Sequence, residues 1–159
     1  MTAARAWLDW CSHTSAIVFI RDSSFGMPAV QSVHLVGLTV LLASILVLNL
    51  RLAEVSMMDW SLPAVDRQLR PLAWGAITLV LASGVLMFLG NPPKYLANPA
   101  FELKMACLAL ASLCQFGLFR RVFRSEPGVR SRSMNIVIAV VSLTLWFSVG
   151  WAGRAIAFV

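Results

Sequence analysis

The chain has 159 residues, of which 59% are hydrophobic and only 13% charged, and its formal net charge is +6. Soluble domains carry about 25% charged residues, so this composition, with a mean hydropathy of +0.79, excludes an ordinary water-soluble domain. The three cysteines are too few for a disulfide-stabilised secreted fold. Composition alone therefore favours an integral membrane protein.

The first part of the chain predicts an amphipathic helix over about residues 3–21. Trp7, Trp10 and Val18 share one helical face, and a polar stretch at residues 21–24 ends the pattern. Tryptophan is enriched at the depth of the lipid headgroups, and an amphipathic helix of this kind lies in the membrane interface. We expect this helix to lie on the membrane surface.

Four long apolar runs follow, and we expect each to cross the membrane as a helix. The predicted spans are residues 29–50, 69–89, 101–119 and 134–158. About 20 helical residues cross a hydrocarbon core of about 30 Å, and a helix satisfies every backbone amide within the segment. Pro71 is expected in the first turn of the second span, where its missing N–H costs nothing.

Short connections between the runs predict how the spans pack. The connection at residues 91–100 contains three prolines, which favour a stiff turn between antiparallel neighbours. We therefore predict an all-α fold: an integral membrane up-down four-helix bundle with an N-terminal interfacial amphipathic helix. Residues 1–159 are expected to form a single membrane domain.

The basic residues are distributed unevenly along the chain. Eight of the 13 flank the first and third connections, including a basic loop at residues 120–133. The positive-inside rule then predicts that both connections are cytoplasmic and that both termini are periplasmic, in a bacterial inner membrane. The lipid bilayer is the expected partner of this charge, rather than nucleic acid.

Three ionisable side chains lie within the predicted spans, where such groups are costly and mark candidate sites. His34, Lys104 and Arg154 come from the first, third and fourth spans. With the predicted orientation, all three fall in the outer half of the bilayer. We therefore predict a pocket in the outer leaflet that binds a small ligand, a cofactor or a membrane partner.

Four further residues belong to the same prediction. Gly37 is one helical turn from the histidine, Gln115 shares a helical stripe with the lysine, Trp146 shares one with the arginine, and Met87 reaches a similar depth. Each charged or polar group can instead have a purely structural role and bind no ligand. Long cationic side chains can extend to the interface, and intramembrane amides and imidazoles can simply bond neighbouring helices.

The sequence leaves several functions open. The first is binding of a ligand, or of a membrane partner that is another protein or a second copy of the chain. The second is a membrane b-type haem protein in electron transfer, with His34 as an axial ligand and Met87, Met105 or His13 as the other. Copper would also use His34 as a ligand. The third is a small metal or solute transporter, although no acidic residue lies at mid-depth. An enzyme acting alone is not expected, because no nucleophile–base pair can be assembled.

Several segments resemble a family of small, uncharacterised bacterial inner-membrane proteins of four spans. They are VHLVGLTVLLASILVLNLRL, SGVLMF, NPAFELK and GRAIAF, and they cover most of the chain. The resemblance implies the same fold and marks His34, Lys104 and Arg154, but it implies no reaction. Asn49 departs from the family, where an aspartate is expected. A fainter similarity runs to the membrane domain of copper-resistance D-type proteins, which also have a histidine on the first helix.

Overall fold

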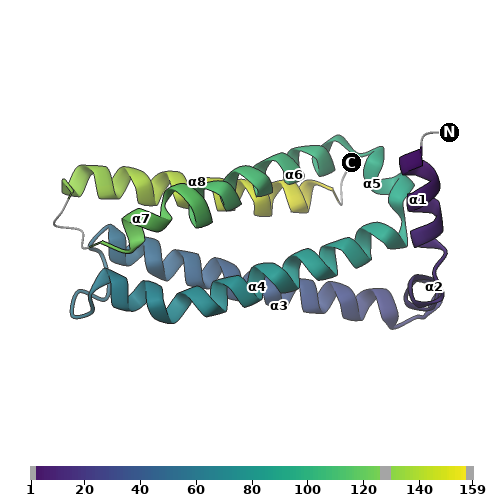
Figure 1. Ribbon diagram of the computed structural model, residues 1–159, viewed down its shortest axis with the longest axis horizontal. Helices are drawn as coiled ribbons and strands as arrows, with labels where there is room; N and C mark the ends of the chain where they lie inside the picture. The colour runs from purple at the N-terminus through teal and green to yellow at the C-terminus, as the bar shows by residue number, and fades with distance from the viewer. Residues whose placement is uncertain (1–2, 126–129, 157–159) are drawn as a thin grey trace.

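The computed structural model describes residues 3–125 and 130–156, and these residues form helices joined by short loops, with no strand (Figure 1). The helices in chain order are α1 (Ala3–Ser12), α2 (Ser15–Asp22), α3 (Gly26–Leu52), α4 (Leu62–Gly90), α5 (Pro92–Leu96), α6 (Pro99–Ser112), a π-helical segment η1 (Leu113–Leu118), α7 (Arg120–Phe123) and α8 (Arg132–Ala155).

Four helical segments are long and apolar enough to cross a membrane. They are α3, α4, the continuous segment Pro99–Leu118 formed by α6 and η1, and α8. The chain is thus an all-α, multi-pass membrane protein with four membrane-competent helices, which confirms the predicted fold class. Residues 157 and 158 of the fourth predicted span lie outside the described residues.

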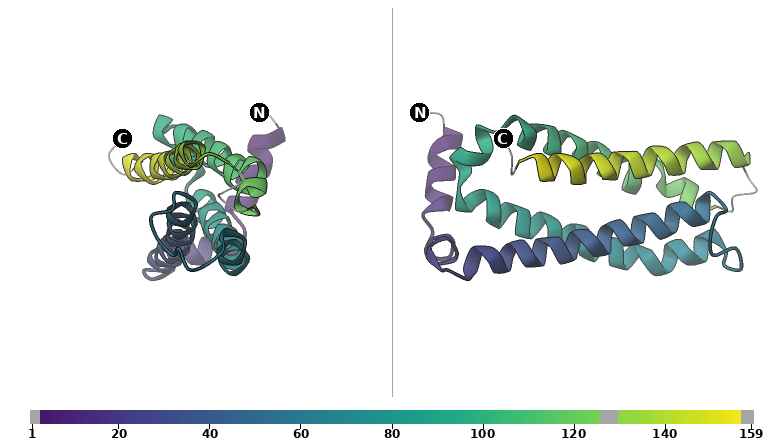
Figure 2. Two further views of the ribbon diagram at one scale, coloured as in Figure 1. Left: turned by 90° about the vertical axis from the view of Figure 1, so that its left-hand side faces the viewer. Right: turned by 180° about the vertical axis from the view of Figure 1, so that it is seen from behind.

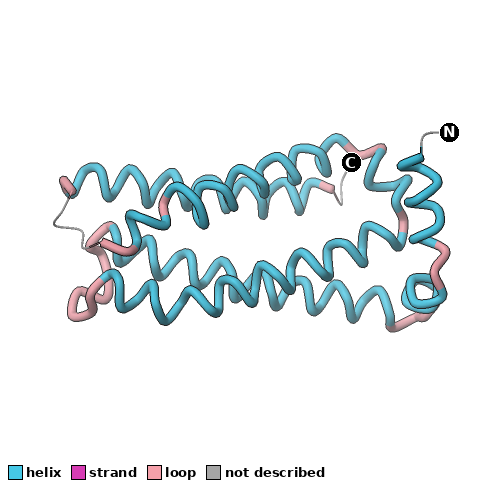
Figure 3. The backbone as a smooth tube through the Cα atoms, viewed as in Figure 1, coloured by secondary structure: helices cyan, strands magenta, loops and turns pink. Residues whose placement is uncertain are grey.

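The four long helices form two antiparallel pairs, α3 with α4 and α6 with α8, stacked on one another (Figure 2). At one end, α1 and α2 run across the bundle next to α5, and both termini lie there (Figure 1). We call this the terminal end. The opposite end carries the loop at residues 53–61 and the loop residues 124–125 and 130–131 (Figure 3). Most of the arginines are in or next to these segments. We call the opposite end the basic end.

Polar residues that precede prolines or apolar runs begin three of the long helices. The side chain of Ser61 accepts a hydrogen bond from the backbone N–H of Ala64 at 3.3 Å, and the Asn98 side chain accepts one from that of Ala100 at 2.9 Å. Ser131 caps α8 in the same way. Each cap satisfies one of the backbone N–H groups that the first helical turn leaves without a partner.

The second span begins earlier than hydropathy predicts. Helix α4 starts at Leu62 rather than near residue 69, so Pro71 lies inside the helix and not in its first turn. Hydropathy misses the added turns because Asp66 and Arg67 are charged. Leu62 and Val65 nevertheless pack against the bundle, and this burial holds the polar turns in a helix.

The predicted N-terminal helix is divided in two. His13 and Thr14 separate α1 from α2, so the expected continuous helix over residues 3–21 is corrected to Ala3–Ser12 and Ser15–Asp22. The following turn brings Gly26 against the backbone of Ile20, with no room for a side chain between them. This close approach folds α2 against the start of α3.

The core lies toward the middle and the basic end of the bundle. A central cluster contains Leu41, Ile45, Trp146 and Val149, and a second cluster at the basic end is centred on Leu52 and its neighbours. At the terminal end, by contrast, α3 has no buried residue before Gly37 and α6 none before Ala111, among the described residues. Helices α4 and α8 do bury residues toward this end, among them Ser83 and Ala152, so the buried contacts here come from one helix of each pair.

The third span changes its winding near its middle. In η1 the backbone N–H of Phe119 donates to the carbonyl oxygen of Cys114 at 2.8 Å, a bond that reaches back five residues rather than four. Such π-helical turns are rare and shift the side chains that follow them around the helix axis. Here the turn contains Gln115, which is buried, and it precedes the arginines of α7.

Candidate functional site

The predicted site residues come from all four spanning helices, and the structure brings two of them into one region. His34 on α3 and Lys104 on α6 are both half-buried in the terminal third of the bundle. They belong to opposite helix pairs, and the charge of Lys104 acts on the imidazole of His34. We call the region around these two side chains, with Ser83, Gly84 and Gly153, the terminal site.

His34 is oriented by a serine on the neighbouring helix. Its Nδ1 lies 2.9 Å from Oγ of Ser83, and that oxygen also lies 2.6 Å from the carbonyl oxygen of Leu79. Two oxygens at this distance are joined by a hydrogen bond, and only the serine hydroxyl has a proton to donate. Nδ1 of His34 must then be the donor to Ser83. The neutral imidazole therefore carries its free lone pair on Nε2, the atom that remains to accept a hydrogen bond or bind a metal.

Small residues stand beside both polar side chains. A methyl group added at Gly84 would lie 3.5 Å from Cε1 of His34, and one added at Gly153 would lie 3.5 Å from Nζ of Lys104. The imidazole of His34 thus lies against the backbone of α4, and the ammonium of Lys104 lies against the backbone of α8. Among the described residues, no hydrogen bond or ion pair holds the ammonium of Lys104.

Arg154 and Met87 lie near the same end of the bundle. Arg154 is exposed in the last turn of α8 and directly follows Gly153. Met87 is half-buried on α4. Their membership of the site stays a prediction. The centre of the terminal site is the half-buried pair His34 and Lys104.

Three other predicted residues have structural roles that the geometry makes plain. Gly37 is buried where α3 crosses α4, and a methyl group there would lie 3.1 Å from a methyl of Val80. Trp146 is 1% exposed within the central cluster. Gln115 is buried as well, and its Oε1 accepts a hydrogen bond from Ser142 on α8 at 2.8 Å. It lies closer to the basic end than the lysine with which it shares a stripe.

His13 lies outside the spans, beside a cleft at the terminal end. It is exposed, and the cleft of about 320 Å³ is lined by the α1–α2 turn, by Arg21, and by residues 90–93 where α4 meets α5. Its Nδ1 is 3.3 Å from the hydroxyl of Ser12. No group of three His, Cys, Asp or Glu side chains that could hold a metal ion occurs in the described part of the chain.

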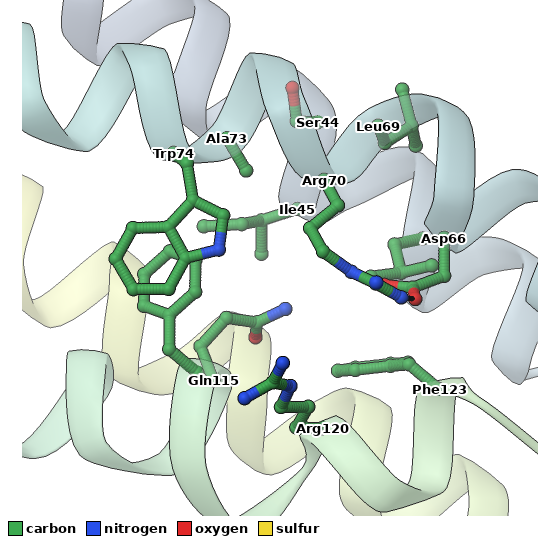
Figure 4. Close-up of a pocket in the computed structure, with 12 residues that line it drawn as sticks. Ser44, Ile45, Asp66, Leu69, Arg70, Ala73, Trp74, Gln115, Arg120 and Phe123 are labelled. Atoms are coloured by element: carbon green, nitrogen blue, oxygen red, sulfur yellow. Dashed lines mark hydrogen bonds and ion pairs between the residues drawn. The ribbon is translucent and has the colours of Figure 1, made fainter.

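A second polar region lies at the basic end, and sequence reasoning missed it. Asp66 and Arg70 form an ion pair one helical turn apart on α4, and Gln115 on η1 and Arg120 on α7 lie across from them (Figure 4). Together they line a cavity of about 40 Å³. The available signal was the four-residue spacing of the acid and the base, which suits a helical ion pair. The predicted second span begins at residue 69, so Asp66 falls outside it and the pairing is not predicted.

Comparison with known proteins gives a family but no activity. The model of a family described as a family of unknown function (DUF6644) matches residues 7–159. No curated protein and no solved structure matches the chain. Because the match covers nearly the whole chain, including all four spanning helices, the chain belongs to this family of unknown function.

Proposed function

We propose that this protein binds a membrane-soluble quinone or quinol at the terminal site. The observation that carries the proposal is the contact between Nδ1 of His34 and Oγ of Ser83, with the charge of Lys104 acting on the same imidazole from the other helix pair. With Nδ1 donating to the serine, Nε2 of the imidazole accepts a hydrogen bond, and the ammonium donates one. A quinol supplies both partners, because one hydroxyl donates to Nε2 and the oxygen of the other accepts from the ammonium; a quinone keeps only the contact with the ammonium.

Depth favours an uncharged head group. His34 lies eight residues after the start of α3, which at 1.5 Å per residue is about 12 Å along the helix. Phosphate head groups stay at the interface because a charge in hydrocarbon is costly. A quinone head carries no net charge and can reach this level. Among the described residues, α3 buries none before Gly37 and α6 none before Ala111, which supports access to this level from the lipid.

The experiment is extraction of the protein in native lipid discs, followed by measurement of quinone per protein chain. We expect the wild type to retain quinone in nearly stoichiometric amount, and His34→Phe and Lys104→Met each to lose most of it. Lys94→Met is the matched control, because Lys94 is exposed in α5. Equal quinone content in all four proteins, at the level of the surrounding lipid, would reject the proposal.

Haem binding is the second candidate function, and the same imidazole favours it. A histidine whose Nδ1 donates to a neighbour presents Nε2 to iron in the usual way. Lys104 would then pair with a haem propionate. The second axial ligand would come from Met87, Met105 or His13. An absorption spectrum of the purified protein tests this function: a Soret band lost in His34→Phe supports it, and a spectrum without one rejects it.

We further infer that the protein resides in a bacterial inner membrane with its basic end in the cytoplasm. The support is the concentration of arginines at that end, next to the loop at 53–61 and in the segments on either side of residues 126–129. Arginine and lysine accumulate on the cytoplasmic side of short loops. The terminal site would then open toward the outer leaflet.

A further inference from the structure

The cavity at the basic end contains more positive charge than its own carboxylate can balance. Asp66 is buried, with 7% of its surface exposed, and it pairs with Arg70. The positive charges of Arg120 and Arg124 also act on Arg70. Two guanidinium groups thus line the cavity with one carboxylate, and Arg124 adds its charge from nearby, which makes the region attractive to an anion.

Arg120 is the group that this arrangement leaves available. Its guanidinium extends from α7 into the cavity and lies beside the amide of Gln115, with Arg70 and Asp66 across the cavity (Figure 4). Among the described residues, no hydrogen bond or ion pair engages it. Arg70 is also one-third exposed at its side chain, although it is paired. Two arginines from different helices, α4 and α7, therefore line a common cavity, and both have N–H groups left to donate.

An apolar wall adjoins the arginines. Trp74 and Phe116 line the same cavity, and their ring centroids lie 4.6 Å apart. Trp74 is 50% exposed on the outer face of α4, where lipid surrounds the bundle. A ligand with both an anionic group and a hydrocarbon chain would match this combination.

The depth of the two arginines agrees with the position of lipid phosphates. Arg70 lies where the apolar run of α4 begins, and Arg120 follows the end of the third apolar segment at Leu118. Both guanidinium groups therefore lie near the boundary between hydrocarbon and headgroups. The cavity of about 40 Å³ has room for only a few atoms, so phosphate oxygens would enter it while the rest of a lipid stays outside.

We propose that this region is a binding site for the phosphate of an anionic phospholipid, held between Arg70 and Arg120. Guanidinium binds phosphate through paired charge-assisted hydrogen bonds, and basic pockets between spanning helices suit anionic headgroups. One acyl chain would lie along Trp74 and Phe116. This site is distinct from the terminal site and does not depend on the function proposed there.

The test is native mass spectrometry of the purified full chain with added phosphatidylglycerol, phosphatidylcholine or inorganic phosphate. We expect one phosphatidylglycerol to bind the wild type at least tenfold more tightly than phosphatidylcholine. Arg120→Gln should remove this preference, and Arg120→Lys should keep part of it. Arg121→Gln is the matched control, because it removes the same charge from the next residue of α7, which does not line the cavity.

Three results would overturn the proposal. The first is an equal preference for phosphatidylglycerol in Arg120→Gln, Arg121→Gln and the wild type. The second is saturation of the site by inorganic phosphate with no further effect of lipid, which would indicate a free-anion site. The third is a tenfold loss of phosphatidylglycerol binding in Asp66→Asn. That variant removes the competing carboxylate, so an anion site should bind the lipid at least as tightly as it does in the wild type.

Discussion

Asn49 on α3 and Ser142 on α8 are joined by a buried hydrogen bond of 3.1 Å, from the amide nitrogen to the hydroxyl oxygen. The hydroxyl of Ser142 donates a hydrogen bond to Oε1 of Gln115, so three spanning helices share one chain of polar contacts. The amide of Asn49 also donates to the carbonyl oxygen of Ile45 at 2.8 Å. This chain locks α3 against the other helix pair.

Replacing Ser142 with alanine should loosen the contact between the two pairs. The substitution leaves Oε1 of Gln115 and one N–H of Asn49 without their partner in a buried region. Interhelical hydrogen bonds in membranes contribute about 0.6 kcal/mol on average and up to about 1.7. We expect a loss of about 1 kcal/mol, measured by unfolding in mixed micelles. Ser148→Ala is the control, because that hydroxyl bonds only the carbonyl of Thr144 on its own helix. Equal losses in the two variants would contradict an interhelical role.

Gly26→Ala should displace the N-terminal helices. A methyl group at this position would collide with the backbone of Ile20, which cannot move aside as a flexible side chain can. Forcing extra atoms into a packed site typically costs about 1–3 kcal/mol. We expect faster proteolysis in the turn between α2 and α3 and a lower melting temperature. Gly75→Ala offers the comparison, since nothing lies within 4 Å of a methyl group there. A Gly26→Ala protein as resistant as Gly75→Ala would show that this contact is not required.

Hydropathy predicted the long helices because each needs only an apolar run of sufficient length. It did not predict where α4 begins, because hydropathy counts the charge of Asp66 against a span. In the structure Asp66 pairs with Arg70 one turn along the same helix. The break at His13 was also missed. Helical spacing on either side of it is continuous, and the backbone bends there without a proline or glycine.

The site was predictable only in part. Depth within a span can be counted along the sequence, so His34 and Lys104 were correctly expected at one end of the bundle. Helical stripes were a poorer guide. Gln115 shares a stripe with Lys104, yet it bonds Ser142 farther along the bundle and lines the other cavity. The partner of the histidine, Ser83, lies on a different helix, and no spacing within α3 could have identified it.

Tyr95 gives a spectroscopic test of packing at the terminal end. It packs between Phe88 and Phe101, with ring centroids 6.2 and 5.4 Å away, and burial raises the pKa of its phenol. Because it is the only tyrosine in the chain, its ionisation can be followed by absorbance near 295 nm without interference. We expect a midpoint above about 10, the value of an exposed tyrosine, with a return to about 10 on unfolding. A midpoint at about 10 in the folded protein would indicate an exposed ring.

The same pKa shift predicts how stability depends on alkaline pH. A phenol whose pKa is raised on folding favours the folded state while it is protonated. Its contribution is complete below about pH 10 and is lost as pH rises through the folded pKa. Tyr95→Phe should remove this alkaline dependence and leave the packing of the ring with Phe88 and Phe101 in place. The melting temperature followed from pH 8 to 11 would show it. Identical alkaline profiles for the two proteins would argue against a buried phenol.

Orientation in the membrane can be measured with single cysteines in a chain whose three native cysteines are replaced. Lys94→Cys tests the terminal end and Ser56→Cys tests the basic end, and both positions are exposed. In intact cells, an impermeant thiol reagent should label the first and not the second. Both should react after the membrane is opened. Labelling of Ser56→Cys alone in intact cells would reverse the proposed orientation.

The most direct test of the terminal site is calorimetric titration of the protein with a short-chain quinol, kept reduced. We predict one binding site per chain, and dissociation constants at least tenfold higher in His34→Phe and in Lys104→Met, because each variant removes one of the two polar groups that would bond the quinol. Lys94→Met should bind as the wild type does. Failure of the wild type to bind quinol, or binding that neither substitution weakens, would contradict the site.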